Sequence, residues 1–392
     1  MKTTRPPEDR SRCGSRTGSW TGTPAGVGPD VAWSEGLRVQ VGGPGTVAHA
    51  GVVLPRHLAD RLDLTGELAR VVARAGFVPG RERGRLLTDA VSSLAAGATC
   101  LTDIEAMTAQ VELFGAEGGA SDSTLLRALD EVADRIGVDG LPGRRLARGM
   151  ARVRDRAWRA VEDRPAGLPA VSVAGVDLRR PSDSDSSGGP GRLPDRPVVV
   201  VRLDATLLEA ASGKAEAAGH YKGGFGFHPI GAWCSNTGEC LAVKLRPGNA
   251  GSSTGTDHVK VIDAALAQIP ARWRTDLLVT IDGAGASHEV IDHLTGLNTA
   301  AEHGRRGRRV EYSIGWPVDA RTMGAVTRLP KDAWTDAVTA EGTVDPDAQG
   351  GRADRDPAPR RTGHRRARQL AGRPAGDRAA DPAAGGQTGQ AR

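Results

Sequence analysis

The chain has 392 residues, of which 39% are hydrophobic and only 3% aromatic, so a core would be built mainly from Val, Leu, Ala and Ile. No run of about 18 apolar residues occurs, and the polar N-terminus lacks the apolar stretch of a signal peptide, which excludes a membrane-spanning helix and predicts a cytoplasmic protein. The net charge of +5 is uneven: residues 350–392 carry ten Arg and four Asp, so the remainder is near −1.

The four cysteines, Cys13, Cys100, Cys234 and Cys240, show neither a Cys-x-x-Cys pair nor the spacing of zinc ligands. Cys234 and Cys240 flank a predicted turn, which would let them face each other across a hairpin. Free thiols in a reducing cytosol are the favoured interpretation.

The first part of the chain divides into a leader and a helical region. Residues 1–48 are rich in Gly, Pro, Thr, Ser and Arg without periodicity, which predicts a disordered leader. Over residues 49–165 apolar residues recur at helical intervals, which predicts an all-α domain. One helix is expected to begin near Ser121 and to bury a stripe of five residues. The stripe consists of Leu125, Leu126, Leu129, Val132 and Ile136.

Arginines gather near the end of the helical region, where the only acid among them is Asp155. They are Arg144, Arg145, Arg148, Arg152, Arg154, Arg156 and Arg159. Such a stretch can follow a phosphate backbone by releasing counterions, and Arg145, Arg148 and Arg152 are our candidates for DNA contact. On this interpretation residues 49–165 are a DNA-binding domain. The alternative is a solvated helix face without a ligand.

After a linker over residues 166–196, the order of elements predicts an α/β domain over 197–345. The expected elements are a strand ending at 204, a hairpin of 225–233 with 240–245, a helix from 256, a strand 277–282, a helix near 287–295 and a strand 310–316. Three antiparallel strands followed by right-handed crossovers place the fourth strand beside the first. That is the mixed sheet of an RNase H-like fold.

Two of these predicted strands end on an aspartate, Asp204 and Asp282. Because neighbouring strand ends meet at one edge of a sheet, the two carboxylates are expected to lie together. Carboxylates suit Mg²⁺ or Mn²⁺, and two such ions about 3.5–4 Å apart support phosphodiester cleavage. A third carboxylate is normally required to hold the second ion.

The residues around these aspartates are more specific than the aspartates alone. They resemble the catalytic blocks of bacterial insertion-sequence transposases with a DDE domain, of the group 1 type common in actinobacteria, over about residues 49–345. The blocks are Leu203–Ala210, His220–Pro229, Ile281–His288 and Tyr312–Val318, with Ala98–Glu105, Glu112–Gly115 and Ser121–Thr124 in the helical part.

The resemblance implies a DNA transposase that cuts and joins DNA ends by two-metal phosphoryl transfer. It makes Asp204 and Asp282 the catalytic, metal-binding aspartates and Mg²⁺ or Mn²⁺ the cofactor. Its partners would be double-stranded DNA, as terminal repeats and target, and a second copy of the chain when DNA is bound, at the nucleoid. Lys222, His228 and His288 become candidates for DNA contact near the cleavage point, with local hydrogen bonding as the alternative.

The family's third acid is a Glu on a helix beyond the fifth strand, and it stays unknown here. After Asp282 the glutamates are Glu289, Glu302, Glu311 and Glu341, none in a segment that resembles that helix. Residues 350–392 contain one Leu and no Val, Ile, Met or aromatic residue, which predicts a disordered tail over 346–392, interpreted as a frameshift product or, alternatively, as a DNA-binding arm. We therefore expect a truncated, inactive transposase. One alternative is a DNA-binding remnant that recognises the ends of the element or inhibits transposition. Another is an RNase H-like nuclease unrelated to transposition.

Overall fold

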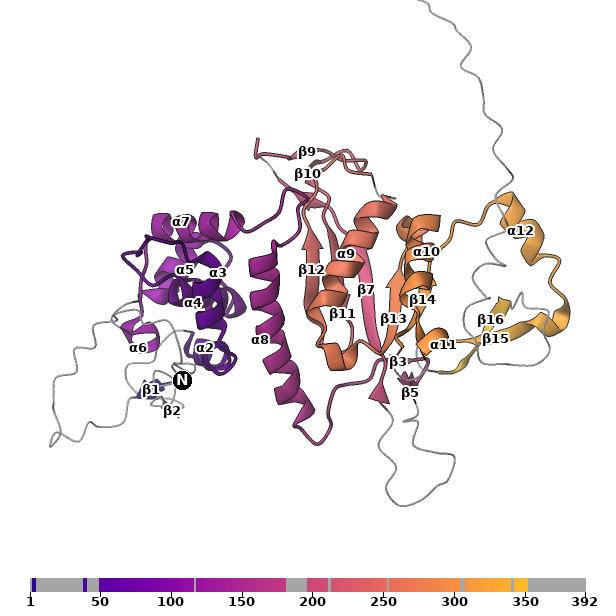
Figure 1. Ribbon diagram of the computed structural model, residues 1–392, viewed down its shortest axis with the longest axis horizontal. Helices are drawn as coiled ribbons and strands as arrows, with labels where there is room; N and C mark the ends of the chain where they lie inside the picture. The colour runs from indigo at the N-terminus through magenta and orange to yellow at the C-terminus, as the bar shows by residue number, and fades with distance from the viewer. Residues whose placement is uncertain are drawn as a thin grey trace, which may run out of the picture. The chain divides into compact units, whose positions relative to one another are not determined.

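The computed structural model describes residues 2–4, 38–40, 49–115, 118–180, 196–210, 213–251, 254–303, 307–339 and 342–351 (Figure 1). Residues up to Trp316 form one compact unit, and those from Pro317 form a second. Cys13, most of the predicted leader and the tail beyond Gly351 lie outside the described residues. In the leader, β1 (Lys2–Thr4) pairs antiparallel with β2 (Arg38–Gln40).

The region predicted to be all-α consists of helices joined by short loops. They are η2 (Ala50–Val52), α2 (Val53–Arg61), α3 (Leu64–Val72), α4 (Arg83–Ala95), α5 (Leu101–Thr108), α6 (Val111–Phe114), α7 (Asp122–Ala133) and α8 (Arg144–Glu162). The predicted stripe of α7 is only partly correct, because Leu126 and Leu129 are 51% and 42% exposed. The helix buries Leu125 and Ala128 instead, three positions apart and therefore on one helical face.

The second half of the first unit is built on a five-stranded mixed sheet (Figure 1). Its strands are β7 (Val199–Ala205), β11 (Ile230–Cys234), β12 (Cys240–Lys244), β13 (Asp276–Ile281) and β14 (Arg309–Ile314). They lie in the order β12-β11-β7-β13-β14. β7, β11 and β12 are antiparallel neighbours, whereas β13 is parallel to both β7 and β14. The prediction that the fourth strand lies beside the first is confirmed.

One face of the sheet is covered by helices α9 (Gly255–Gln268), α10 (His288–Leu297) and α8. Alternate strand residues such as Val201, Leu203 and Val279 pack against them in one core. The intervening residues must therefore point to the opposite face, because successive side chains of a strand alternate. Pro270 follows α9, and the short 3-10 turn η3 (Ala271–Trp273) leads into β13.

The predicted strand 225–233 is two strands, and this expectation is corrected. β10 (Phe225–Phe227) pairs with β8 (Leu208–Glu209) and β9 (Ala218–Gly219) in a separate small sheet, whereas β11 belongs to the large sheet. Pro229 explains the break, since it has no N–H for a ladder and restricts the backbone of the residue before it. Cys234 and Cys240 are free thiols, as expected, and so is Cys100.

Part of the predicted linker forms short pairs of strands. They are β3 (Ser172–Val173) with β4 (Val176–Asp177), and β5 (Arg179–Arg180) with β6 (Arg196–Pro197). The rest of the linker, 181–195, lies outside the described residues. A one-turn helix, α11 (Ala300–His303), precedes β14.

The second unit contains α12 (Ala320–Val326), η6 (Lys331–Ala333) and a hairpin of β15 (Trp334–Val338) with β16 (Val344–Gly351). The predicted tail starts too early, because residues 346–351 belong to β16. Backbone hydrogen bonds with β15 order this stretch, and side-chain composition gives no signal of them. In both units, no helix of the described residues is long and apolar enough to cross a bilayer.

Candidate active site and DNA interface

The two predicted catalytic aspartates lie at one end of neighbouring parallel strands: Asp204 is the last residue but one of β7, and Asp282 directly follows β13. In the register of β7 and β13, Leu203 pairs with Ile281, so Asp204 and Asp282 come next at the same end of both strands. Both aspartates are exposed, although the residues just before them are buried. The predicted juxtaposition of the two strand ends is therefore confirmed, and the catalytic role of the aspartates stays a prediction.

Alternation along the strands sets the direction of these carboxylates. Leu203 and Ile281 pack in the core beneath the helices, so Asp204 and Asp282 belong to the opposite face of the sheet. Within the described part of the chain, no hydrogen bond or ion pair engages the carboxylate of Asp204. An exposed, unengaged carboxylate at a strand end has its full set of oxygen lone pairs available to a hard cation.

No third acid joins the two aspartates among the residues that the structure describes. Among the described residues, no group of three or more His, Cys, Asp or Glu side chains is placed to hold a metal ion. The Glu289 carboxylate accepts a hydrogen bond of 3.0 Å from the Thr256 hydroxyl, which holds it at the first turn of α9. Glu311 pairs with Arg180 at 2.6 Å. The side chain of Glu302 and all of Glu341 lie outside the described residues.

The histidine candidates differ in exposure. His228 is only 3% exposed, and its Nδ1 lies 3.0 Å from the carbonyl oxygen of Ala250. Its own carbonyl accepts a hydrogen bond of 2.9 Å from Nε of Arg246, which is also buried. These contacts support the local, structural alternative for His228. His288 is exposed at the start of α10 and remains accessible to DNA.

Lys222 lies on a turn whose stabilising contacts the sequence did not indicate. It is exposed, with its Nζ 5.8 Å from the centre of the Tyr221 ring. Its backbone N–H donates to Nδ1 of His220 at 3.3 Å, so Nε2 of His220 carries the hydrogen and donates to Glu209 at 2.8 Å. A Cβ on Gly224 would lie 2.5 Å from that nitrogen, which explains the glycine. The sequence indicated the turn but not the hydrogen bond between His220 and Glu209 beside it.

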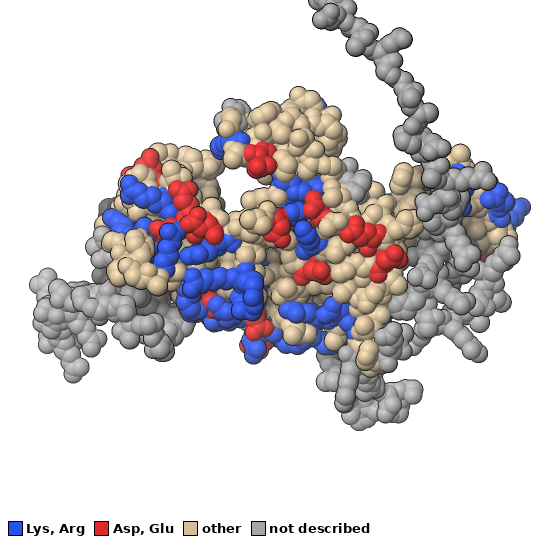
Figure 2. Space-filling view, turned by 45° about the horizontal axis from the view of Figure 1, so that its top comes forward, with Lys and Arg blue, Asp and Glu red and all other residues tan. Residues whose placement is uncertain are grey.

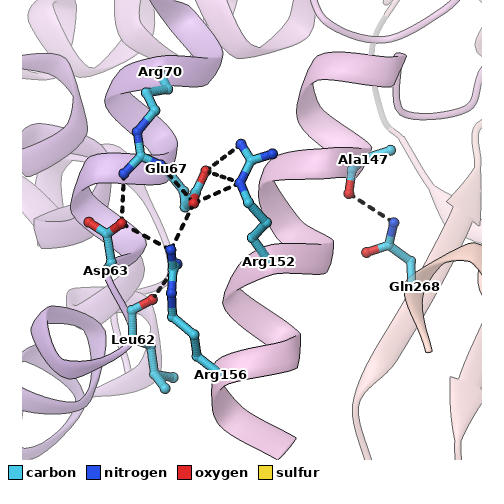
Figure 3. A network of polar contacts seen from close by, with 8 residues as sticks. All are labelled: Leu62, Asp63, Glu67, Arg70, Ala147, Arg152, Arg156 and Gln268. Atoms are coloured by element: carbon cyan, nitrogen blue, oxygen red, sulfur yellow. Dashed lines mark hydrogen bonds and ion pairs between the residues drawn. The ribbon is translucent and has the colours of Figure 1, made fainter. Parts of the chain in front are cut away.

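Two arginines of the α8 cluster, Arg152 and Arg156, are neutralised from helix α3 (Figure 3). Glu67 of α3 is completely buried, and its carboxylate accepts from Nη2 of Arg152 at 2.6 Å and from Nη2 of Arg156 at 3.2 Å. Arg70 contributes a third contact at 2.7 Å. Burial disfavours the charged form of Glu67, but the hydrogen bonds from Arg152 and Arg70 outweigh it and hold its pKa below the ordinary value.

The remaining arginines of α8 divide into two groups. Arg154 pairs with Glu239 of the sheet at 2.7 Å, and Arg159 pairs with Asp155 at 3.0 Å. By contrast, Arg144, Arg145 and Arg148 are exposed and make no ion pair with a described residue. Arg145 donates to the carbonyl oxygen of Ala73 at 2.8 Å. Of the three candidates, Arg145 and Arg148 thus remain without a counter-charge, whereas Arg152 has one.

Arg152 and Arg156 of α8 also border a cleft between α8 and the end of α9. Its volume is about 370 Å³, and its charged lining consists of Arg152, Asp155, Arg156 and Arg274. Burial, aided by the nearby charge of Arg308, lowers the pKa of Arg274. Figure 2 shows Lys and Arg side chains in groups on this face, with Asp or Glu side chains among them. Side chains of both charges are therefore interspersed on this surface, which is not uniformly positive.

Comparison with known proteins identifies the segment that carries the sheet. A family model described as Transposase DDE domain group 1 matches residues 194–353, which include both aspartates and all five strands. The match continues past residue 345, where the sequence alone suggested that the family pattern ends. No curated protein matches the chain. Residues 194–353 are therefore similar to the transposase DDE domain of group 1.

Proposed function

We propose that this chain is the transposase of a bacterial insertion element, of the group common in actinobacteria, acting on DNA at the nucleoid through an RNase H-like sheet. The observation that carries the proposal is the position of Asp204 and Asp282 at the same end of parallel neighbours β7 and β13, inside the matched segment. Its substrates would be the element's terminal repeats and target DNA, bound by two copies of the chain.

The residues at this edge fit a divalent metal. Asp204 and Asp282 offer exposed carboxylate oxygens, the ligands that Mg²⁺ and Mn²⁺ prefer, without apolar side chains of the core between them and solvent. Two bound divalent metal ions would activate the attacking oxygen and neutralise charge on the phosphate. The protein's own contribution is to hold the two carboxylates on strands of one rigid sheet, so that little reorganisation is needed when DNA arrives.

Two carboxylates are one short of the usual two-metal set, and the described residues supply no third. We therefore propose that this chain on its own binds metal and DNA but does not cut. The exposed Arg144, Arg145 and Arg148 favour a second candidate function, a DNA-binding remnant that occupies element ends and inhibits transposition. The two functions differ in whether Asp204 and Asp282 bind a divalent metal ion, which a remnant that only binds DNA does not require.

Metal binding and cleavage test the first proposal separately. We expect Mn²⁺ titration followed by electron paramagnetic resonance to show binding that Asp204→Asn and Asp282→Asn each weaken and the double variant abolishes. On end-containing duplexes with Mg²⁺, wild type and double variant should be equally inert. Unchanged Mn²⁺ binding in the double variant would remove the aspartates from the site. Nicking by wild type that Asp204→Asn abolishes would show that another group completes it.

Arg148 and Arg152 provide a matched pair for the DNA interface. Arg148→Gln should reduce the slope of log affinity against log salt by about 0.9 and leave thermal stability unchanged, because an exposed arginine contacts at most one phosphate. Arg152→Gln should instead lower the melting temperature, because it removes the hydrogen bonds that Nε and Nη2 of Arg152 donate to buried Glu67. Fluorescence anisotropy at several salt concentrations measures the salt slope of each variant, and thermal denaturation measures its melting temperature. Equal salt slopes for Arg148→Gln and wild type would contradict an interface at that residue.

A further inference from the structure

The face of the sheet that carries the two aspartates also carries a row of four side chains across four strands. Arg202 of β7 is paired with Trp233 of β11 on one side and with Thr280 of β13 on the other. Thr280 is paired in turn with Ser313 of β14. Residues directly opposite in a ladder share a face, so these side chains form one line. The line lies two residues, about 7 Å, before the aspartates.

The indole of Trp233 lies along its own strand toward the aspartates. A Cβ built on Gly231 would be 2.2 Å from Cη2 of Trp233 and 2.7 Å from Cζ2 and Cζ3, so the six-membered ring covers Gly231. Gly231 is the residue paired with Asp204 on the neighbouring strand. The ring is therefore about one strand spacing, 4.8 Å, from the backbone of Asp204. Glycine at 231 is what allows the ring to lie there.

The Trp233 indole lies outside the apolar core, and neither it nor the Arg202 guanidinium makes a polar contact with a described residue. Trp233 is partly exposed and stands outside the apolar core of the sheet, whose β11 members are Ile230, Ala232 and Cys234. Its N–H has no hydrogen-bond acceptor among the described residues, and the exposed Arg202 beside it has no acidic partner there. A flat aromatic surface and an unpaired guanidinium next to two carboxylates are suited to a ligand with both a planar ring and a phosphate.

We infer that Trp233 and Arg202 form a platform for the nucleotide that adjoins the scissile phosphodiester: Trp233 stacks on its base and Arg202 contacts its phosphate. A nucleobase has a π-face whatever its sequence, so stacking holds a splayed DNA end without reading it. A phosphate at Arg202 lies on the same face as Asp204 and Asp282, so the platform would position the strand for the carboxylates. Trp233 and Arg202 are positioning residues in this scheme, and the inference rests on the proposed function.

The first measurement identifies the contact directly and does not need catalysis. The full chain is bound in Ca²⁺ to a duplex with a single-stranded overhang that contains 5-iodouracil, and is irradiated at a wavelength that excites only this base. Peptide mass spectrometry of the product should find the cross-link on Trp233. The same duplex without the overhang should give little cross-linked product, because paired bases are not available for stacking.

Variants then measure what the platform contributes. Trp233→Ala should weaken binding of the overhang DNA about tenfold, whereas Trp233→Phe, which retains an aromatic face, should weaken it much less. Gly231→Ala should act like Trp233→Ala, because the new methyl group displaces the ring while every polar atom stays in place. Trp334→Ala, at a partly exposed tryptophan of the second unit, is the control and should leave affinity unchanged.

The outcomes distinguish the inference from the function on which it rests. A wild-type protein that binds DNA but cross-links elsewhere overturns the platform and leaves the transposase proposal intact. The platform is also overturned if Trp233→Ala binds as tightly as Trp334→Ala, or if Trp233→Phe is as weak as Trp233→Ala. Failure of the wild type to bind any DNA overturns both. Because the cross-link is located in the wild type, an unfolded variant does not affect that part of the test.

Discussion

Replacement of Trp158 by alanine should lower the free energy of unfolding by about 3–5 kcal/mol, the range for truncating a buried tryptophan. Trp158 is only 1% exposed, although it stands on the arginine-rich helix α8, and it packs in the core of the sheet. Its ring meets Trp273 edge-on at 6.1 Å between centres, and its indole N–H donates to Glu239. Alanine would leave a cavity and remove the donor from that carboxylate.

Urea denaturation followed by circular dichroism measures this effect, with two companion variants. Trp158→Phe fills most of the cavity but cannot donate to Glu239, so it should lie between wild type and Trp158→Ala. Trp316→Ala, which removes a ring that is 45% exposed, should change stability by less than about 0.5 kcal/mol. A Trp158→Ala protein as stable as Trp316→Ala would show that α8 does not dock on the sheet as described.

Replacement of Glu67 by glutamine should cost about 2–4 kcal/mol. Removing one partner of a buried ion pair typically costs 3–5 kcal/mol, and we place this case lower because its arginines reach solvent, where screening reduces the effect. The side chain of Glu67 is fully buried, whereas those of Arg70 and Arg152 are about half exposed. Asp134→Asn, which breaks the exposed pair with Arg74, is the control and should cost less than about 1 kcal/mol.

Acid should erase the difference between wild type and Glu67→Gln. The folded-state pKa of Glu67 lies below its ordinary value of about 4.3. Its contribution to stability is therefore complete above pH 4.3 and is lost as the pH falls through the lower, folded-state pKa. Melting temperatures at pH 7 should differ clearly between the two proteins and converge on acidification. A gap that persists unchanged below the folded-state pKa would show that the glutamine acts through packing rather than charge.

The position of the two aspartates could be predicted because it depends on local patterns and one topological rule. Each strand is an apolar run that ends on Asp204 or Asp282, and right-handed crossovers bring the fourth strand beside the first. The interruption at Pro229 was also visible in the sequence, yet the aromatic and apolar residues on both sides of it favoured a single strand. The small sheet of β8, β9 and β10 depends on pairings between short segments whose periodicity is too brief to detect.

The charge balance of α8 could not be predicted from its own sequence. The cluster seemed to face the single acid Asp155, but its main partner Glu67 lies 85 positions away from Arg152, and Glu239 lies 85 positions from Arg154. Neither distance leaves a local signal. The same reasoning applies to Trp233, whose position beside Asp204 requires both the strand register and the absence of a side chain at Gly231.

Helix α8 is joined on one side to α3 through Glu67 and on the other to the sheet through Trp158. Each added residue in a helix advances the chain by 1.5 Å and rotates it by about 100°. Insertion of a single residue would therefore turn one of these two seams away from its partner. A helix held on both sides in this way fixes the distance and rotation between α3 and the sheet. If the helical part holds DNA as proposed, the bound sequence meets the carboxylates at a constant offset in base pairs, which the length of this helix sets.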